Sequence, residues 1–260
     1  MAEQVHQQSF EEEEPLTGKV CLVTGSSRGI GRGIAEALAG SGASVIVNYR
    51  ASEAQAYDVV DGIENAGGQA IPCQADVTDH EQVTAMCDRV HEAVGSVDVL
   101  VNNAGITADR RFENMTWEEW RRVLAVCLDG AFNCTKAFFE DVRDADGGRV
   151  INVSSVIGKQ GNYGQTNYAA AKSGLFGFTR SLARELAPHG STANCVAPGY
   201  TRTDMVDDVP DHIQDDLREQ IPLDRFAEVD EVAHLVQYLA SPRSAYMTGE
   251  VLDLNGGMHL

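Results

Sequence analysis

Short apolar runs alternate with helix-length amphipathic segments from Leu16 to the end of the chain. The runs are rich in valine and isoleucine, as expected of strands that are buried on both faces of a parallel sheet. Because a helical pattern fills each interval, we predict an α/β fold with a doubly wound, seven-stranded parallel sheet and helices on both faces. The predicted strands are Val20 to Thr24, Ser44 to Asn48, Ala70 to Cys73, Val97 to Val101, Val150 to Val153, Thr192 to Val196 and Val251 to Leu254.

The chain shows neither a break in composition nor an internal repeat, so we predict one domain over residues 16–260. Residues 1–15 are polar and acidic and end in Pro15, which predicts a disordered tail. Another unusual segment, Thr201 to Leu223, is rich in aspartate and lies between Pro198 and Pro222. We interpret this segment as an insertion that is able to cover a site.

The charge of the chain is strongly negative, with a net value of -19. A surface of this kind repels nucleic acid and anionic membranes, and salt relieves its self-repulsion. Of the 20 basic residues only four are lysines: Lys19, Lys136, Lys159 and Lys172. This balance resembles that of proteins from salt-accumulating halophiles, and an acidic protein from a mesophile is the alternative.

The six cysteines are scattered without a CxxC pair, which favours free thiols over a zinc site or a disulfide framework. We therefore expect no metal. No apolar run reaches the roughly 18 residues needed to span a bilayer, and Met1 to Glu14 lacks the apolar core of a signal peptide. We expect a cytoplasmic protein that contacts neither membranes nor nucleic acid.

Tyr168 and Lys172 have the spacing of neighbours on one helix face, and Ser155 lies shortly upstream. An ammonium beside a phenol favours the ionised phenol, so the pair is suited to donate a proton to a carbonyl oxygen. A serine hydroxyl can bond the same oxygen and stabilise its developing charge. Taken singly, these residues are also typical of a packed ring, a surface cation and a turn, so the prediction depends on the rest of the chain.

A glycine-rich turn, Thr24 to Gly31, follows the first predicted strand and precedes a helical pattern. Glycines permit a tight turn and a close approach of the backbone, and the N-terminus of the following helix favours a pyrophosphate. Because the turn begins the first strand-helix-strand unit, we predict that it binds a dinucleotide rather than only shaping the chain.

The end of the second predicted strand bears on the choice of dinucleotide. An acidic residue here would bond the ribose diol of NAD, whereas a basic residue accommodates the extra phosphate of NADP. The chain has Arg50 at this place and Arg28 in the glycine-rich turn. The sequence therefore predicts NADP as the cofactor, with higher activity on NADPH than on NADH.

These motifs together resemble those of the single-domain short-chain dehydrogenase/reductases, across almost all of Leu16 to Leu260. The resemblance implies a Rossmann fold with strand order 3-2-1-4-5-6-7, and usually a tetramer, so we expect a homotetramer. The motifs occur in the family's order and spacing: Thr-Gly-x-x-x-Gly-Ile-Gly at 24–31, Ala75-Asp76-Val77, Asn102-Asn103-Ala104-Gly105, Ser155 with Tyr168 and Lys172, and Pro198-Gly199.

The resemblance also implies a role for each site residue. In ketone reduction NADPH delivers a hydride to the carbonyl carbon, Tyr168 donates a proton to the oxygen, Ser155 bonds that oxygen, and Lys172 also bonds the nicotinamide ribose. Tyr168 and Lys172 thus count among the cofactor contacts. The other expected cofactor contacts are Gly25, Ser27, Arg28, Gly29, Ile30, Gly31, Asn48, Tyr49, Arg50, Asp76, Val77, Asn103, Ala104, Gly105, Pro198, Gly199, Thr201 and Thr203.

One position departs from the family pattern, since the chain has Cys127 where the family usually has asparagine. In relatives that asparagine bends its helix, and its backbone carbonyl helps to hold a water that leads to the lysine. A cysteine keeps the carbonyl and loses the amide, so we hypothesise that the proton relay persists with altered helix geometry. We do not interpret Cys127 as a nucleophile, because no histidine lies near it in the sequence.

Within the family, the similarity is greatest to reductases of 3-oxoacyl thioesters, which act on acetoacetyl-CoA or on 3-oxoacyl-acyl-carrier protein. Three segments carry it: Asn103 to Asp109, Gly161 to Tyr168 and Leu254 to His259. It implies that the substrate is bound by Asp109, Asn162, Tyr163 and Gln165 together with Ser155 and Tyr168. The alternative is that the loop residues only shape the turn.

Carrier-protein reductases typically dock their acidic partner just before the fifth strand and at the end of the catalytic helix. Here these places are Asp144 to Gly148 and Pro188 to Gly190, which would repel an acidic carrier. We therefore predict reduction of acetoacetyl-CoA to (R)-3-hydroxybutyryl-CoA for polyhydroxyalkanoate synthesis, with the CoA bound by arginines such as Arg110, Arg111 or Arg202. The alternatives are a 3-oxoacyl-acyl-carrier-protein reductase of fatty acid synthesis, a sugar or polyol dehydrogenase, and a noncatalytic NADP-binding sensor or scaffold.

Overall fold

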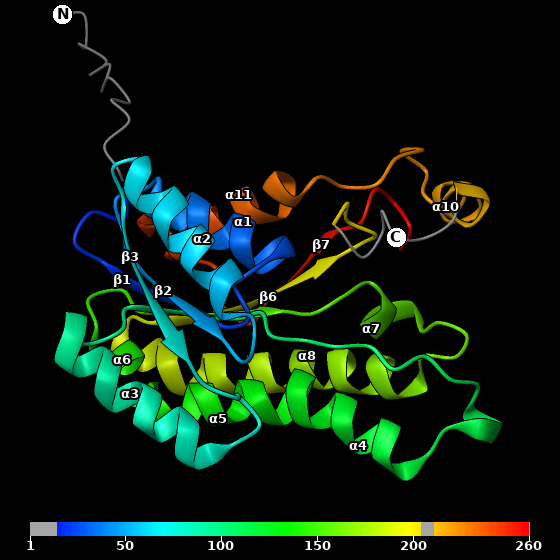
Figure 1. The fold of residues 1–260 in the computed structure, drawn as a ribbon, viewed down its shortest axis with the longest axis horizontal. Helices are drawn as coiled ribbons and strands as arrows, with labels where there is room; N and C mark the ends of the chain where they lie inside the picture. Colours follow the sequence, from blue (N-terminus) through cyan, green and yellow to red (C-terminus); the bar gives the residue numbers. More distant parts are fainter. Residues whose placement is uncertain (1–14, 204–210, 260) are drawn as a thin grey trace, which may run out of the picture.

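A seven-stranded parallel sheet forms the centre of the computed structural model, which describes residues 15–203 and 211–259 (Figure 1). Its strand order, β3-β2-β1-β4-β5-β6-β7, confirms the predicted fold and the order implied by the resemblance. The predicted tail falls on residues 1–14, outside the described residues, as does the 204–210 part of the predicted insertion. The strands are β1 (Val20–Val23), β2 (Ser44–Tyr49), β3 (Gln69–Gln74), β4 (Val99–Asn102), β5 (Arg149–Val153), β6 (Thr192–Pro198) and β7 (Val251–Leu254).

Helices cover both faces of the sheet, as Figure 1 shows. One face carries α1 (Gly29–Ala39), α2 (Glu53–Asn65) and α11 (Val229–Ala240). The other face carries α3 (His80–Val94), α4 (Trp117–Leu124), α5 (Gly130–Ala137), α6 (Phe139–Asp144) and α8 (Thr166–Leu186). The short helices α7 (Ile157–Gln160) and α10 (Asp211–Arg218) lie beyond one end of the sheet. Single turns of 3₁₀-helix cover Phe112–Asn114, Ala187–His189 and Pro242–Ser244, and a π-helical turn covers Ala125–Asp129.

Alternation along the strands divides the core into two layers, because successive strand side chains point to opposite faces. Val23 packs in the layer of α1, α2 and α11, whereas its neighbour Leu22 packs in the layer of α3, α5 and α8. Helix α1 lies close against α11, since a Cβ at Gly33 would overlap Cγ1 of Val229. Side chains therefore fill both faces of the sheet, so a binding site is expected at the ends of the strands rather than on a face.

All six cysteines are buried free thiols. Burial raises the pKa of Cys134 to about 12 and that of Cys195 to about 11, so these thiols stay protonated and unreactive near neutral pH. Within residues 15–203 and 211–259, no cluster of three or more histidine, cysteine, aspartate or glutamate side chains is arranged to hold a metal ion. The described helices include none that is both long and apolar enough to cross a membrane.

The sheet has one place where its order reverses. Strand β1 lies between β2 and β4, so the chain leaves toward β2 on one side and returns to β4 on the other. In open α/β sheets, ligands bind in the crevice that such a reversal opens beyond the carboxyl ends of the strands. Most of the predicted site residues lie at or after carboxyl ends of strands, at the start of α1 or on α8, and this crevice is therefore the candidate site.

Candidate active site

Ser155, Tyr168 and Lys172 meet at the carboxyl end of β5. Ser155 follows the strand, and Tyr168 and Lys172 lie one turn apart on α8. The Lys172 side chain is only 3% exposed, and its Nζ donates to the backbone oxygen of Val153 at 2.7 Å. The same Nζ lies 5.7 Å from the ring centroid of Tyr168. The ammonium is thus fixed between the strand end and the phenol, as the helical spacing predicts.

Two buried side chains that the sequence prediction left out hold α8 in this position. The Ser154 hydroxyl donates to the backbone oxygen of Lys172 at 2.8 Å, which ties the helix to the end of β5. Asn167 is fully buried, and its amide donates to the backbone oxygens of Ala108 at 3.0 Å and Glu119 at 3.3 Å. In the sequence, both residues stand out only as polar neighbours of Ser155 and Tyr168. Their hydrogen-bond partners can be identified only from the fold.

The glycine-rich turn lies at the neighbouring carboxyl end, that of β1. Gly25 and Gly29 have positive φ values of 62° and 55°, which glycine adopts without strain. A Cβ at Gly31 would overlap the backbone oxygen of Gly25, so the turn folds tightly on itself. Helix α1 begins at Gly29, and the residue before it, Arg28, supplies no side-chain cap. The N–H groups of the first turn are therefore free of a side-chain acceptor.

Thr24 organises this turn, although the sequence prediction did not include it. Its Oγ1 accepts from the backbone N–H groups of Asn103 and Ala104, both at 3.0 Å. The Asn103 amide returns hydrogen bonds to the backbone oxygens of Thr24 at 2.9 Å and Gly25 at 3.1 Å. A Cβ at Gly25 would lie 3.0 Å from the Cα of Ala104. Asn103 and Ala104, predicted as cofactor contacts, thus also build the wall of the turn.

Asn48, another predicted cofactor contact, uses its side chain inside the protein. Its Oδ1 accepts from the Gly25 N–H at 3.1 Å, and its Nδ2 donates to the backbone oxygens of Cys73 and Ala75, both at 3.2 Å. The side chain is 2% exposed. Asn48 therefore ties the glycine-rich turn to β2 and β3. The neighbouring Tyr49 is also buried.

The end of β2 leaves its arginine open. The Arg50 side chain is 65% exposed, and its Nη1 lies 3.8 Å from Oδ2 of Asp76, which follows β3. Asp76 itself accepts from the backbone and hydroxyl of Thr78. Arg28 is exposed at the start of α1. One arginine thus follows β1 and the other follows β2, and Val77, next to Asp76 in the chain, is buried.

The segment after β6 runs past the same turn. Strand β6 ends at Pro198, and the Gly199 N–H donates to the backbone oxygen of Leu254 at 2.8 Å. Farther along, Thr201 pairs with Ala227. A Cβ at Gly29 would lie 3.6 Å from Cγ2 of Thr203, so this segment closes over the start of α1. The structure thus brings Thr203, one of the predicted contacts after β6, to the glycine-rich turn.

Cys127 lies in the π-helical turn between α4 and α5. Its sulfur is 3.5 Å from both the backbone nitrogen and the backbone oxygen of Ile106, so the thiol accepts from the one and donates to the other. A Cβ at Gly105 would lie 3.4 Å from Nζ of Lys172 and 3.6 Å from Sγ of Cys127. Cys127 thus lies in a widened helical turn close to the lysine, and whether this geometry differs from that of relatives with asparagine stays a prediction.

The four predicted substrate residues form one rim. Nε2 of Gln165 donates to both carboxylate oxygens of Asp109, at 3.0 and 2.9 Å, and Nδ2 of Asn162 donates to Oε1 of Gln165 at 2.9 Å. The Tyr163 ring points outward and is 75% exposed. Burial, with a smaller effect of Asp109, raises the pKa of Tyr200, which places that phenol near the rim. The loops after β4 and before α8 are thus joined at the mouth of the site.

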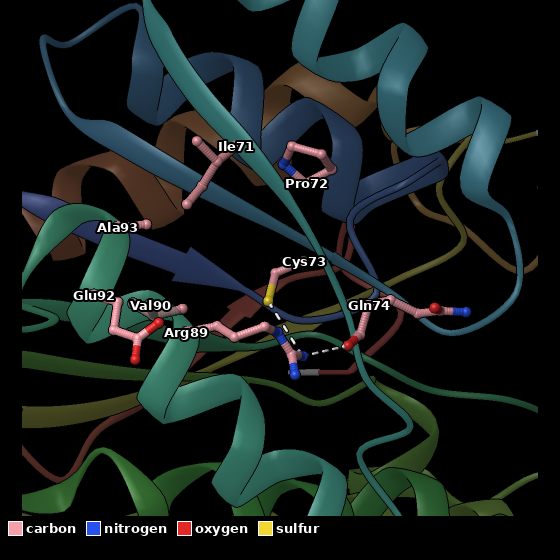
Figure 2. A pocket seen from close by; sticks show the side chains of 8 residues that line it. All are labelled: Ile71, Pro72, Cys73, Gln74, Arg89, Val90, Glu92 and Ala93. Atoms are coloured by element: carbon pink, nitrogen blue, oxygen red, sulfur yellow. Dashed lines mark hydrogen bonds between the residues drawn. The ribbon is translucent and has the colours of Figure 1, made fainter.

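A groove of about 560 Å³ lies elsewhere, between the edge strand β3 and helix α3 (Figure 2). Arg89 crosses it and donates to the backbone oxygen of Gln74 at 2.7 Å. None of the predicted site residues lines this groove, so we assign it no part in the reaction. The residues that line it are Ile71, Pro72, Cys73, Gln74, Arg89, Val90, Glu92 and Ala93.

A family model described as enoyl-(acyl carrier protein) reductase matches residues 25–259. A crystal structure of a dehydrogenase/reductase from Sinorhizobium meliloti superposes with a TM-score of 0.91 at 37% sequence identity, covering 96% of this chain and 98% of the other. The chain belongs to the short-chain dehydrogenase/reductase family. Members of this family are oxidoreductases, so the predicted enzyme class agrees with these matches.

Curated short-chain reductases are similar over nearly the whole chain. The 3-oxoacyl-[acyl-carrier-protein] reductase FabG of Staphylococcus aureus is 45% identical over 242 residues, which are 93% of this chain and 98% of the relative. The enzyme of the same name from Aquifex aeolicus is 44% identical over 244 residues, which are 94% and 98% of the two chains. The Synechocystis reductase of this description gives the same figures.

Proposed function

We propose that this protein is an NADPH-dependent reductase of 3-oxoacyl thioesters. The observation that carries the proposal is that the Lys172 ammonium is held between the carboxyl end of β5, which Ser155 follows, and the Tyr168 ring, while a glycine-rich turn after β1 leads into a helix N-terminus. The high identity to reductases named for 3-oxoacyl substrates supports the thioester. The intact Ser-Tyr-Lys set favours an enzyme over a noncatalytic sensor.

The residues present fit a dinucleotide. The start of α1 lacks a side-chain cap, so its first N–H groups are available to a pyrophosphate, which the helix dipole also favours. The bound NADPH supplies the hydride that the substrate carbon accepts. Arg28 and Arg50 flank the strand ends where the adenosine ribose would lie, and they favour the extra phosphate of NADP.

The protein side of the reaction is proton donation and charge stabilisation. Tyr168 gives its phenolic proton to the substrate oxygen while Ser155 donates a hydrogen bond to the same oxygen. The Lys172 ammonium lies 5.7 Å from the Tyr168 ring centroid and stabilises the phenolate that is left. Since Lys172 is buried and already bonds the Val153 oxygen, its charge is held in place before the substrate arrives.

We propose the acyl-carrier-protein thioester as the physiological substrate, because the three relatives described above are all named for it. Acetoacetyl-CoA, reduced to (R)-3-hydroxybutyryl-CoA for polyester storage, is the second candidate. One observation favours this candidate: the turn before β5 exposes Asp144 and Asp146, and Asp144 engages the neighbouring Arg143 at 2.6 Å. An acidic carrier would meet this turn less readily than a basic one.

The deciding experiment follows NADPH oxidation with acetoacetyl-carrier protein and with acetoacetyl-CoA, each at low and at molar salt. We expect turnover on both and higher kcat/KM on the carrier protein, and the Tyr168→Phe variant, which keeps the ring, is the inactive control. Higher kcat/KM on acetoacetyl-CoA would favour the second candidate. Bound NADPH without turnover on either thioester would contradict the proposal and favour a sensor.

Cofactor choice is tested in the same assay. Higher activity with NADPH than with NADH is expected, and Arg50→Glu should move the preference toward NADH. Equal or better kcat/KM with NADH for the unchanged protein would overturn the assignment of NADP.

We further propose that the protein works in the cytoplasm as a homotetramer and tolerates high salt. Exposed aromatic rings such as Phe132 and Tyr246 are suited to an interface between copies. The net charge of -19 is better screened as salt rises. Light scattering over a salt series tests both statements, and a monomer at every salt concentration would contradict the tetramer.

A further inference from the structure

An arginine at the outer rim of the candidate site has no carboxylate partner. The guanidinium of Arg111 lies over the Tyr163 ring, with Cζ 5.4 Å from the ring centroid. No carboxylate of residues 15–203 or 211–259 lies within ion-pair distance of it, although the chain carries a net charge of -19. The adjacent Arg110 instead donates through Nε and Nη2 to Glu119, at 3.1 and 3.0 Å. Arg111 thus forms no ion pair with the part of the chain that the structure describes.

The loop that carries the Tyr163 ring is fixed by hydrogen bonds to the other residues of the rim. The Tyr163 N–H donates to Oδ1 of Asn162 at 2.9 Å, and Asn162 continues into the Gln165–Asp109 hydrogen bonds. From the other side, the Arg110 N–H donates to the backbone oxygen of Gly164 at 2.7 Å. Segments 109–111 and 162–165 therefore hold each other. The arginine and the ring are presented as one unit.

Stacking leaves the guanidinium ready for an anion. A guanidinium over an aromatic face is attracted to the ring without a hydrogen-bond acceptor on it, so its N–H groups stay available to other acceptors. These N–H groups form a fork that matches two oxygens of a phosphate. The position is also suitable, since Tyr163 lies only five residues before Tyr168 and points outward, away from the reacting groups.

We propose that Arg111, stacked on Tyr163, binds the phosphate of the substrate's phosphopantetheine arm. This inference rests on the proposed function. The thioester lies at one end of that arm and the phosphate at the other, so a carbonyl at Ser155 and Tyr168 places the phosphate at the rim. CoA and acyl-carrier protein both carry this phosphate, so Arg111 recognises a group that the two candidate substrates share.

The test compares thioesters that differ in their phosphates. Steady-state KM and kcat are measured with NADPH for acetoacetyl-pantetheine, acetoacetyl-4′-phosphopantetheine, acetoacetyl-CoA and acetoacetyl-carrier protein. Arg111→Gln should raise KM about fivefold to tenfold for the three substrates that carry phosphate, as expected for loss of a charge-assisted hydrogen bond at an exposed site. KM for acetoacetyl-pantetheine, and kcat for all four, should stay unchanged. Arg180→Gln is the matched control, because Arg180 is exposed on α8 and its loss changes the net charge equally.

Two further variants examine the stack. Tyr163→Phe keeps the ring, so the ratio of KM for acetoacetyl-4′-phosphopantetheine to KM for acetoacetyl-pantetheine should match that of the unchanged protein, whereas Tyr163→Ala should raise this ratio about twofold to fivefold. Arg111→Lys keeps the charge without the fork and should fall between Arg111→Gln and the unchanged protein.

The outcomes separate this inference from the proposed function. If the unchanged protein reduces all four thioesters but Arg111→Gln has the same KM values, this inference alone fails. An equal rise in KM for acetoacetyl-pantetheine would mean that the substitution disturbs the rim, and it would also overturn this inference. A rise in KM for acetoacetyl-CoA alone would overturn it as well, because Arg111 would then bind the nucleotide phosphates of CoA. If the unchanged protein reduces none of the thioesters, the proposed function fails and this inference fails with it.

Discussion

Two adjacent serines at the end of β5 offer the sharpest test of the proposed chemistry, because one supports the fold and the other is the residue for which we propose a hydrogen bond to the substrate oxygen. Ser154 is buried, and its hydroxyl donates to the backbone oxygen of Lys172 at 2.8 Å. Ser155 is half-buried, and its Oγ accepts from the Ile157 N–H at 3.2 Å. The Ser155 hydroxyl proton is thus free to reach a substrate oxygen. Replacing each serine by alanine removes one hydroxyl and nothing else.

The two variants should differ in kcat much more than in stability. Loss of an oxyanion donor lowers kcat by about 10²–10³-fold, so we expect this loss for Ser155→Ala, with at most about 1 kcal/mol of stability lost with the bond to Ile157. Ser154→Ala breaks a buried neutral hydrogen bond, which costs about 1 kcal/mol. Its kcat should fall by less than about tenfold, because Nζ of Lys172 still bonds the Val153 oxygen.

The assay pairs kinetics with unfolding. NADPH oxidation on the preferred thioester gives kcat, and urea titration followed by circular dichroism gives the unfolding free energy of each variant. A Ser154→Ala variant that loses as much kcat as Ser155→Ala would refute the division of roles. So would a Ser155→Ala variant with near-normal turnover, since the substrate oxygen would then have another donor.

Three further predictions concern packing, ionisation and the cysteine. Gly33→Ala should lower the unfolding free energy by about 1–3 kcal/mol, since the methyl group meets α11, whereas Gly62→Ala, in open space on α2, should raise it by about 0.5–1 kcal/mol; urea titration compares them. Hydrogen bonding to Arg225 lowers the pKa of Glu231 from 4.5 to about 2. Because the Glu231 side chain is 40% exposed, Glu231→Gln should lower the unfolding free energy by under about 1 kcal/mol above pH 4.5. Thermal melts over a pH series should show that this loss disappears as pH falls through 2. Cys127→Asn should change kcat by less than about tenfold, and a rise of several orders of magnitude would show that the relay is impaired in the unchanged protein.

The strands could be predicted from the sequence because burial on both faces leaves a run of apolar residues that no other element shares. Val251–Leu254 was predicted with its observed bounds, and the other strands differ from the prediction by one or two residues at one end or at both. The largest extension is in β6, which continues to Pro198. Proline is tolerated there because the strand is ending, and sequence pattern alone marks it as a break.

Features of the candidate site that depend on residues close in sequence could be predicted, whereas those that depend on distant segments could not. Tyr168 and Lys172 were predictable because helical spacing alone places them together. The hydrogen bonds of Asn48 were not, because its partners Gly25, Cys73 and Ala75 come from three different segments. Side-chain amides and hydroxyls carry no signal of whether they face a ligand or the backbone of a distant strand. The prediction therefore named candidate positions and left their supporting contacts unassigned.

The widened turn at Cys127 arises from close packing on both of its sides, and this explains why it forms without an asparagine. Leu128 packs on α8 at Gly174, where a Cβ would lie 2.9 Å from the leucine Cδ2. On the other side, a Cβ at Gly130 would lie 2.7 Å from Cγ2 of Val77. These contacts fix Leu128 and Gly130, which follow Cys127. The extra residue of the π-helical turn allows the helix to make both contacts. The thiol then needs only to satisfy the Ile106 backbone, which it does as both donor and acceptor. The geometry beside Lys172 thus depends more on the two glycines than on the cysteine.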